Sequence, residues 1–321
     1  MAYVEGGNRI RRCILLPPQR REGRNQVDRR HFIETAVGAA GLTVVGSRLA
    51  LPAAEAGSPK PTDRIEIGKT GVKVTRIAMG TGTVGYKHSS NQTRAGQESF
   101  TRVARRAYEA GINFFDSADL YGSMPFFKSA MEGVPRDKFV YLSKIMGNVD
   151  AAKAQEDLER FLKEFGTDYI DIVLTHCATS ADWAKRREGV LEVLSKAKQK
   201  GMIRACGVSW HGMEPLETVA DTKWGDFALV RINNKGAKMD GPSEKVAPHV
   251  KKIHDSGKFV MGMKILGEGT IKDSDEIDAS LRYVLGLGTV SAMTIGFEKP
   301  EQVDDLLKRW ESAAKAVAKA A

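Results

Sequence analysis

The sequence predicts an α/β protein that folds as a (β/α)8 TIM barrel with a short β-hairpin in front of it. Eight short apolar segments alternate with segments whose apolar residues recur at helical spacing. Eight is the number of parallel strands that closes such a barrel. A doubly wound open sheet is the rival fold. It would require a G-x-G-x-x-G turn after the first strand, but Gly80, Gly82 and Gly85 have a different spacing and no helix pattern follows them.

Composition and charge set limits on the class of protein. The chain has 321 residues, of which 42% are hydrophobic and 28% charged, which is typical of a soluble globular protein. Nine arginines and five acidic residues lie in residues 1–56, and the remaining basic residues are interspersed with acids, so no nucleic-acid partner is predicted. Cys13, Cys177 and Cys206 show no CxxC or Cys/His ligand spacing, and we expect no metal site.

The first 56 residues resemble a twin-arginine export signal. Arg29 and Arg30 precede His-Phe-Ile, a weakly apolar stretch follows at residues 35–45, and Ala-Glu-Ala at 54–56 fits a cleavage site. The stretch is too short to cross a bilayer, so the mature form is predicted to have no membrane span. This pattern predicts the twin-arginine export machinery as a partner and a periplasmic or exported location. A disordered basic tail with a chance arginine pair is the alternative.

Residues 57–63 are predicted to be a linker and residues 64–321 the barrel domain. The stretch IEIGKTGVKVTRIAMGTG alternates like a hairpin with its turn at residues 68–71. The eight barrel strands are expected at residues 76–79, 113–115, 139–143, 170–174, 205–208, 228–232, 259–263 and 292–295. Helices are expected between them, among others at residues 97–110, 151–165, 183–200 and 300–314.

Polar residues follow the apolar runs of successive strands. The second strand ends in Asp116 with Tyr121 in the next loop, the third in Lys144, and the fourth in His176. Because the active sites of such barrels lie at the carboxyl ends of the strands, these four side chains are expected to meet at one rim. Taken singly, each has an ordinary structural explanation, such as a helix cap or a core histidine.

Together the four residues suit one chemistry. A tyrosine ordinarily has a pKa of about 10, and a neighbouring ammonium is expected to lower it, which makes the phenol a workable general acid. A carboxylate beside the lysine holds the ammonium in place, and a neutral histidine donates a hydrogen bond to a carbonyl oxygen. This apparatus would protonate an alkoxide as hydride arrives from a nicotinamide, because no side chain can supply hydride.

These residues carry a resemblance to the aldo-keto reductase superfamily. The motifs NFFDSADLYG, YLSKI, DYIDIVLTH and GMIRACGVS, together with TIGFEKPEQVDDLL near the end, are similar to that family in order and spacing from about residue 64 to residue 310. The resemblance implies a (β/α)8 barrel, NADP(H) as the usual cofactor, a small carbonyl or alcohol substrate, and a catalytic tetrad of Asp116, Tyr121, Lys144 and His176.

The cofactor side departs from the family pattern. The implied contacts are Ser209, Arg231, Asn233, Gly296 and Lys299. Trp210 and His211 follow the serine in place of asparagine, and RINNK replaces Q-x-x-Y-N after the sixth strand. Glu298 occupies the position that usually meets the 2′-phosphate, and Leu306 replaces an asparagine that often contacts adenine.

These departures leave three hypotheses open. The first is a reductase with altered cofactor geometry that prefers NAD(H), since a glutamate suits a ribose hydroxyl better than a phosphate. The second is an exported oxidoreductase that retains its nicotinamide and recycles it between two substrates. The third is a non-enzymatic binding or regulatory barrel, which the intact tetrad disfavours, because a binding module has little reason to keep a costly buried charge cluster.

Overall fold

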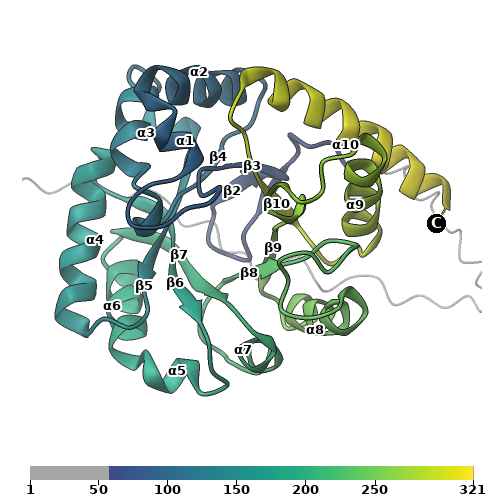
Figure 1. Ribbon diagram of the computed structural model, residues 1–321. Coiled ribbons are helices and arrows are strands. Elements are labelled where there is room, and N and C mark those ends of the chain that lie inside the picture. The colour runs from purple at the N-terminus through teal and green to yellow at the C-terminus, as the bar shows by residue number, and fades with distance from the viewer. Residues whose placement is uncertain (1–57, 321) are drawn as a thin grey trace, which may run out of the picture. The chain divides into compact units, whose positions relative to one another are not determined.

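A computed structural model of the chain describes residues 58–320 (Figure 1). The predicted export signal lies outside these residues. Within the described part, the fold is a closed barrel of eight parallel strands surrounded by helices, as the alternation of strand and helix patterns predicts. No helix among residues 58–320 is long and apolar enough to cross a membrane.

The barrel strands pair in chain order, and the last one closes on the first. Their bounds are β3 (Ile77–Gly80), β4 (Phe114–Asp116), β5 (Val140–Met146), β6 (Ile170–Ala178), β7 (Ile203–Trp210), β8 (Phe227–Arg231), β9 (Phe259–Met263) and β10 (Ala292–Gly296).

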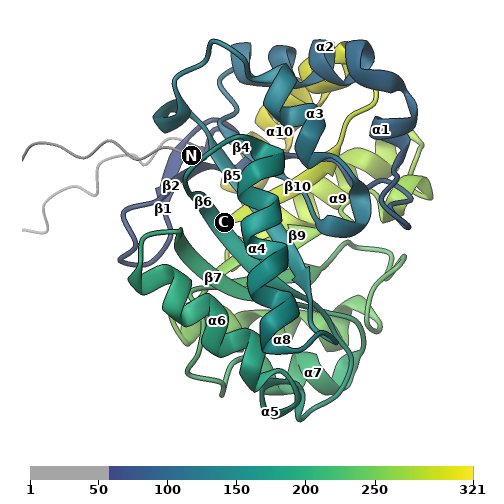
Figure 2. The ribbon, with the colours of Figure 1, turned by 90° about the vertical axis from the view of Figure 1, so that its left-hand side faces the viewer.

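The helices lie on the outside of the strands, as α4 and α6 do over β5, β6 and β7 in Figure 2. They are α1 (Asn91–Arg94), α2 (Gly96–Glu109), α3 (Met124–Ala130), α4 (Ala151–Phe165), α5 (Trp183–Arg186), α6 (Glu188–Gln199), α7 (Met213–Val219), α8 (Ser243–Asp255), α9 (Ser274–Gly286) and α10 (Pro300–Ala320). Three 3-10 turns complete the set: η1 (Asp119–Tyr121), η2 (Arg136–Lys138) and η3 (Gly267–Gly269).

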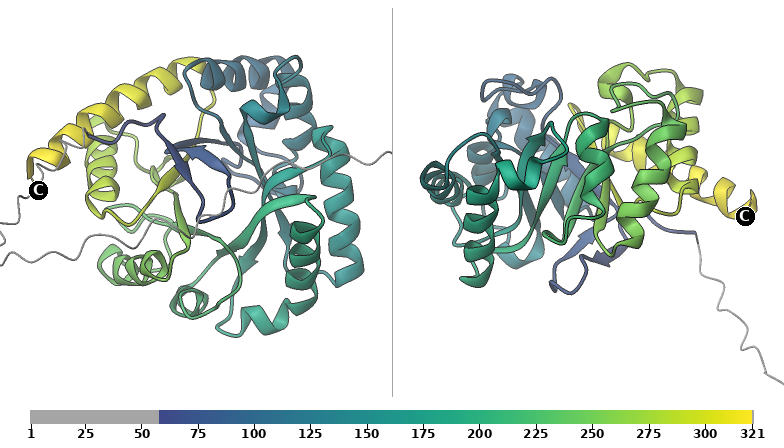
Figure 3. Two further views of the ribbon diagram at one scale, coloured as in Figure 1. Left: turned by 180° about the vertical axis from the view of Figure 1, so that it is seen from behind. Right: turned by 90° about the horizontal axis from the view of Figure 1, so that it is seen from below.

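The predicted hairpin forms the floor of the barrel. Strands β1 (Arg64–Glu66) and β2 (Lys73–Thr75) pair antiparallel, and seen from behind they lie across the amino end of the barrel (Figure 3). Ile67, Val72 and Val74 are fully buried and belong to the same core cluster as the inward-facing residues of the barrel strands. The hairpin therefore closes the end opposite to the one where the strands finish.

Two cores follow from the period of the strands. Alternate strand residues such as Phe114, Leu142 and Leu174 fill the barrel interior. Their neighbours, such as Phe115, Tyr141 and Val173, pack against the surrounding helices. Since successive strand side chains point to opposite faces, each strand carries one set of residues toward the barrel axis.

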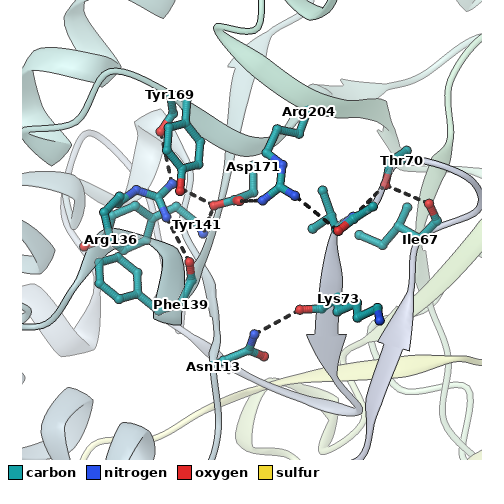
Figure 4. A network of polar contacts seen from close by, with 12 residues as sticks. Ile67, Thr70, Lys73, Asn113, Arg136, Phe139, Tyr141, Tyr169, Asp171 and Arg204 are labelled. Carbon is teal, nitrogen blue, oxygen red and sulfur yellow. Dashed lines mark hydrogen bonds and ion pairs between the residues drawn. The ribbon is translucent and has the colours of Figure 1, made fainter. Parts of the chain in front are cut away.

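A buried carboxylate organises the amino end (Figure 4). Asp171 Oδ2 accepts hydrogen bonds from Arg136 Nη2 at 2.7 Å and from the Tyr141 amide at 3.0 Å. Arg204 Nη1 donates to Oδ1 at 3.0 Å, and Arg204 Nη2 donates to the Gly71 carbonyl of the hairpin turn at 3.1 Å. The network ties the floor of the barrel to the strands β5, β6 and β7.

The guanidinium of Arg136 also lies over three aromatic rings, with its Cζ 4.2 Å from the centroid of Tyr169, 4.8 Å from that of Tyr141 and 5.1 Å from that of Phe139. A planar guanidinium can stack on such faces while its edges donate hydrogen bonds. Its Nη1 donates to the Phe139 carbonyl at 2.8 Å. The Arg136 guanidinium is therefore held by hydrogen bonds at its edges and by aromatic rings at its faces.

The expected helix at residues 183–200 is wrong in one respect, because it is divided at Arg187 into α5 and α6. Arg187 has φ −111° and ψ 14°, outside the helical region. Its guanidinium turns inward and donates to the carbonyls of His176, at 2.8 Å, and Cys177, at 2.5 Å. Satisfying these strand-end carbonyls interrupts the helix.

Candidate active site

The inward-facing residues of the strands continue past the barrel core to the carboxyl end. Asp116 lies two residues beyond Phe114, Lys144 two beyond Leu142, and His176 two beyond Leu174. With a period of two, each keeps the inward direction of the core residue below it. We expected Lys144 and His176 at the ends of their strands. The strands β5 and β6 continue to Met146 and Ala178, so both residues lie within strands.

Asp116 and Lys144 form a buried ion pair between β4 and β5. Lys144 Nζ donates to Asp116 Oδ1 and, at 2.6 Å, to the Ser117 carbonyl. The second carboxylate oxygen accepts from Thr294 Oγ1 of β10 at 2.9 Å. Lys144 is only 1% exposed. Burial lowers its pKa, and the charge of Asp116 opposes that effect. The two side chains are therefore paired, and the anchoring role of the aspartate stays a prediction.

Tyr121 is held on the η1 turn by glycines. Gly122 ends the turn in the left-handed region with φ 64°, and a Cβ there would lie 2.1 Å from the His88 carbonyl oxygen. The tyrosine ring rests on Gly82 and Gly85, where a Cβ would approach it to 2.4 Å and 2.5 Å. Only glycine lets the chain come this close. The GTGTVG segment at the end of β3 and just after it therefore packs directly against the Tyr121 ring.

The ring of Tyr121 lies between the lysine and the histidine. Lys144 Nζ is 4.9 Å from its centroid, and the His176 ring meets it edge-on with the centroids 6.0 Å apart. The phenol thus lies beside two of the other predicted catalytic residues.

The predicted effect on the tyrosine is wrong in direction. The pKa of Tyr121 is raised well above its ordinary value, because the phenol is buried and because the negative charge of Asp116 disfavours a phenolate. Asp116 neutralises the lysine whose charge was expected to lower that pKa. At neutral pH the tyrosine therefore carries its proton.

His176 is buried, with 6% exposure, and its Nδ1 has no hydrogen-bond partner among the described residues. Burial and the nearby charge of Lys144 lower the pKa of His176 well below its usual value. The imidazole is consequently neutral, as predicted. A neutral imidazole has one N–H to donate and one nitrogen to accept with.

A cavity of about 370 Å³ opens beside Asp116 and Tyr121. Its walls come from the loop after β3, from the segment after β9 and from the end of β10. Gly80, Gly82 and Gly296 contribute to the wall, whereas Lys264, Lys272 and Gln302 supply polar groups. The volume is in the range of about 300–1,000 Å³ that is typical of small-molecule sites.

Of the five predicted cofactor residues, the structure places only Gly296 in the lining of this cavity. Ser209 is buried at the end of β7, and its Oγ accepts from the Cys177 amide at 3.2 Å. Arg231 pairs with Asp240 of the following loop. Lys299 is exposed and outside the cavity lining.

Asn233 is engaged by its own loop and by the segment after β9. Its Nδ2 donates to the carbonyls of Ala237, at 2.8 Å, and Lys264, at 2.9 Å. Its Oδ1 accepts from the amides of Lys235 and Ala237. These bonds shape the loop after β8, and a cofactor contact by this side chain remains a prediction.

Sequence reasoning missed the segment after β9. Lys264 forms an ion pair with Glu268 at 2.8 Å, and both residues have left-handed backbone angles, with φ 61° and 55°. Lys272 and, from α10, Gln302 complete this wall. The available signal was the Gly-Glu-Gly at residues 267–269, shortly after the strand that ends at Met263, since paired glycines are typical of a loop that approaches a ligand closely.

The family model that describes the aldo/keto reductase family matches residues 76–283, the greater part of the barrel. The chain belongs to this family. A NAD/NADP-dependent indole-3-acetaldehyde reductase of Schizosaccharomyces pombe is 28% identical over 161 residues, which cover 49% of this chain and 54% of that protein. The NADH-specific methylglyoxal reductase of Escherichia coli is 24% identical over 270 residues, which cover 77% of this chain and 79% of that protein.

The chain spans about half the length of several of the curated relatives it matches. Solved structures of other aldo/keto reductases share the fold. The holo form of one from Bacillus halodurans superposes with a TM-score of 0.62 at 18% identity, covering 81% of this chain and 97% of that one. One from Klebsiella pneumoniae in complex with NADPH has a TM-score of 0.56 at 20% identity, covering 76% and 87%.

The residues around the cavity fit a nicotinamide nucleotide. A Cβ at Gly82 would run into the Tyr121 ring, so glycine there lets the loop after β3 and the phenol line the cavity side by side. Met263, Ile265 and Ile277 provide apolar surface, and the ammonium groups of Lys264 and Lys272 suit phosphate oxygens. Such a mixture of apolar walls and a few polar groups is typical of cofactor sites.

Proposed function

We propose that this aldo/keto reductase is a nicotinamide-dependent oxidoreductase that reduces aldehyde or ketone carbonyls to alcohols, with Tyr121 as the general acid. The observation that carries the proposal is the arrangement of a protonated phenol beside the Asp116–Lys144 pair and a neutral His176. The names of the relatives that act on indole-3-acetaldehyde and methylglyoxal support the same reaction class.

A reduced nicotinamide, when bound in the cavity, supplies the hydride to the carbonyl carbon. Tyr121 gives its Oη proton to the carbonyl oxygen, and its raised pKa keeps that proton in place until charge develops on the oxygen. Lys144 then stabilises the phenolate that remains, and Asp116 keeps the ammonium in position. His176 donates one ring N–H to the same carbonyl oxygen and thereby orients the substrate.

Within this proposal, the cavity lining supports a preference for NAD(H) over the NADP(H) that is usual in the family. Glu298 lines its outer part, and Asn91 Nδ2 donates to the Glu298 carboxylate at 2.6 Å. A carboxylate in this place accepts hydrogen bonds from ribose hydroxyls and repels a 2′-phosphate. Lys264, Lys272 and Gly296 are the residues we assign to the phosphates and their surroundings.

The test measures turnover of a panel of aldehydes and ketones with NADH and with NADPH, alongside a binding titration of both nucleotides. We expect Tyr121→Phe to lower kcat by about 10²- to 10⁴-fold, the usual contribution of a general acid. Tyr108→Phe, on the outer helix α2, is the matched control and should leave turnover unchanged. Unchanged turnover in Tyr121→Phe would refute the assignment, and a wild type that binds neither nucleotide would refute the function.

The proposal extends to export by the twin-arginine route and a periplasmic location, which the Arg29–Arg30 pair and the 54–56 cleavage motif support. Replacing both arginines with lysine should keep the protein in the cytoplasm, as measured by fractionation. Continued export of that variant would contradict the proposal. A nicotinamide nucleotide that co-purifies with the exported protein would support the hypothesis of a retained cofactor.

A further inference from the structure

A second buried carboxylate lies next to the catalytic residues without a part in the proposed chemistry. Asp119 opens the η1 turn two residues before Tyr121, and its side chain is 11% exposed. A buried carboxylate is costly unless a cation or hydrogen bonds compensate it. The partners of Asp119 are therefore informative about what holds this turn.

Arg160 of α4 reaches across to Asp119. Its Nη2 lies 2.9 Å from Asp119 Oδ1, and it is the closest cation to this carboxylate among the described residues. The guanidinium is fixed from its own helix, since Nη1 donates to Glu164 at 2.9 Å and Nη2 donates to Asp157 at 2.9 Å. Arg160 is thus oriented by α4 and presents its positive charge to the turn.

The opposite side of the turn is held by the loop after β3. His88 Nδ1 lies 2.9 Å from the Asp119 carbonyl oxygen and 3.4 Å from its Oδ1. The His88 carbonyl in turn touches Gly122, at the other end of the turn. The turn that carries Tyr121 therefore lies between a helix and a loop, and Asp119 contacts both.

We propose that Asp119 and Arg160 are positioning residues that hold the η1 turn so that the Tyr121 hydroxyl stays aligned with Lys144 and His176. Without Arg160, the buried Asp119 carboxylate loses its main compensating charge and moves toward water, and it takes the turn with it. A displacement of about 1 Å in a catalytic group can cost about 10²-fold in rate. The inference rests on the proposed function, because turnover depends on this alignment only if Tyr121 is the general acid.

The experiment compares three variants of the full chain. Arg160→Met should lower kcat by about 10-fold or more, with the KM for the nucleotide unchanged because Arg160 lies outside the cavity lining. Adding Asp119→Asn should restore most of the rate, since no unpaired carboxylate then remains in the turn. Arg106→Met, on the outer helix α2, makes the same replacement in an exposed ion pair with Asp304 and is the matched control, with wild-type kcat expected.

A spectroscopic readout separates positioning from simple stabilisation. The protein is labelled with ¹³C at the tyrosine ζ carbons, and the Tyr121 resonance is identified by its loss in Tyr121→Phe. That resonance should move in Arg160→Met, return toward its wild-type shift in the double variant, and stay in place in Arg106→Met. An unmoved resonance, or a double variant no faster than Arg160→Met, overturns the proposal.

The two proposals fail in distinguishable ways. If the wild type turns over no carbonyl compound, the proposed function fails, and the Tyr121 resonance still decides whether Arg160 sets the position of the turn. If the wild type is active and Arg160→Met keeps its kcat within about twofold, the enzyme stands and the positioning role is refuted.

Discussion

The amino end of the barrel holds Asp171 and the carboxyl end holds Asp116, and each carboxylate is buried against a basic side chain. Both oxygens of Asp171 accept hydrogen bonds, from two arginines and a backbone amide. The arginines also donate to backbone carbonyls, and Arg136 stacks on aromatic rings. Around Asp116, Lys144 and Thr294 each donate a hydrogen bond to one carboxylate oxygen. In the adjoining His176, however, Nδ1 has no hydrogen-bond partner in the described part of the chain.

The two ends differ in what lies next to the charges. The cavity lies beside Asp116, whereas Asp171 is enclosed by Tyr141, Tyr169 and the hairpin turn. Buried polar groups in proteins are normally hydrogen-bonded, so those left without a partner beside a cavity mark a site. A saturated network stabilises the fold, and an unsaturated one keeps groups available for a substrate.

The largest effect on stability is expected at the amino end. Asp171→Asn leaves Arg136 and Arg204 without a counter-charge, and removing one partner of a buried ion pair typically costs about 3–5 kcal/mol in the free energy of unfolding. Urea unfolding measures that loss, and kcat at low temperature should be unchanged because the change is remote from Tyr121.

The control is Asp304→Asn, which breaks the exposed pair between Arg106 and Asp304 on the outer helices α2 and α10. Exposed ion pairs contribute little to stability. If Asp171→Asn were no more destabilising than Asp304→Asn, the network in Figure 4 would not be the structural support that its geometry indicates.

At the carboxyl end, replacing both members of the buried ion pair is expected to raise the free energy of unfolding, by less than Asp171→Asn lowers it. Lys144→Met alone should destabilise, since it leaves Asp116 buried and unpaired. The double variant Asp116→Asn with Lys144→Met should regain that stability and exceed the wild type by about 1–4 kcal/mol, as replacement of a buried pair often does. Its turnover should be lost. A double variant that is both less stable than Lys144→Met and active would show that the pair serves the fold instead.

Much of the fold was predictable because it follows from local patterns. The predicted bounds of β9 and of α4 agree with the structure, since their apolar spacing is regular and Gly166 ends the helix in the left-handed conformation. The division at Arg187 was not predictable. It depends on carbonyls of β6 that come near only after the barrel has closed.

The same distinction applies to the site. Asp116, Lys144 and His176 could be placed from the sequence, because strand period and barrel topology bring inward residues to one end. The direction of the pKa shift of Tyr121 could not, since it depends on how far Asp116 offsets the lysine and how deeply the ring is buried. Lys264, Lys272 and Gln302 come from separate segments that form one wall only in three dimensions.

The last prediction concerns the pH dependence of the free energy of unfolding and compares the wild type with a variant that lacks His176. The pKa of His176 in the folded protein is lowered well below its ordinary value of about 6.5, by burial and by Lys144, so the folded state stays neutral where the unfolded chain takes up a proton. The unfolded state then binds more protons, and stability falls as the pH drops below about 6.5, by up to about 1.4 kcal/mol per pH unit. Above that pH the contribution of His176 is constant.

His176→Gln removes this titration. The free energy of unfolding of the wild type, measured relative to that of the variant, should therefore be constant between pH 7 and 8 and should decrease from pH 6 to pH 5. The lowered pKa of His211 acts in both proteins and cancels from the difference. A difference that stays constant down to pH 5 would mean that the folded imidazole takes up a proton, and Lys144 would then face a second positive charge instead of a hydrogen-bond donor poised for a carbonyl oxygen.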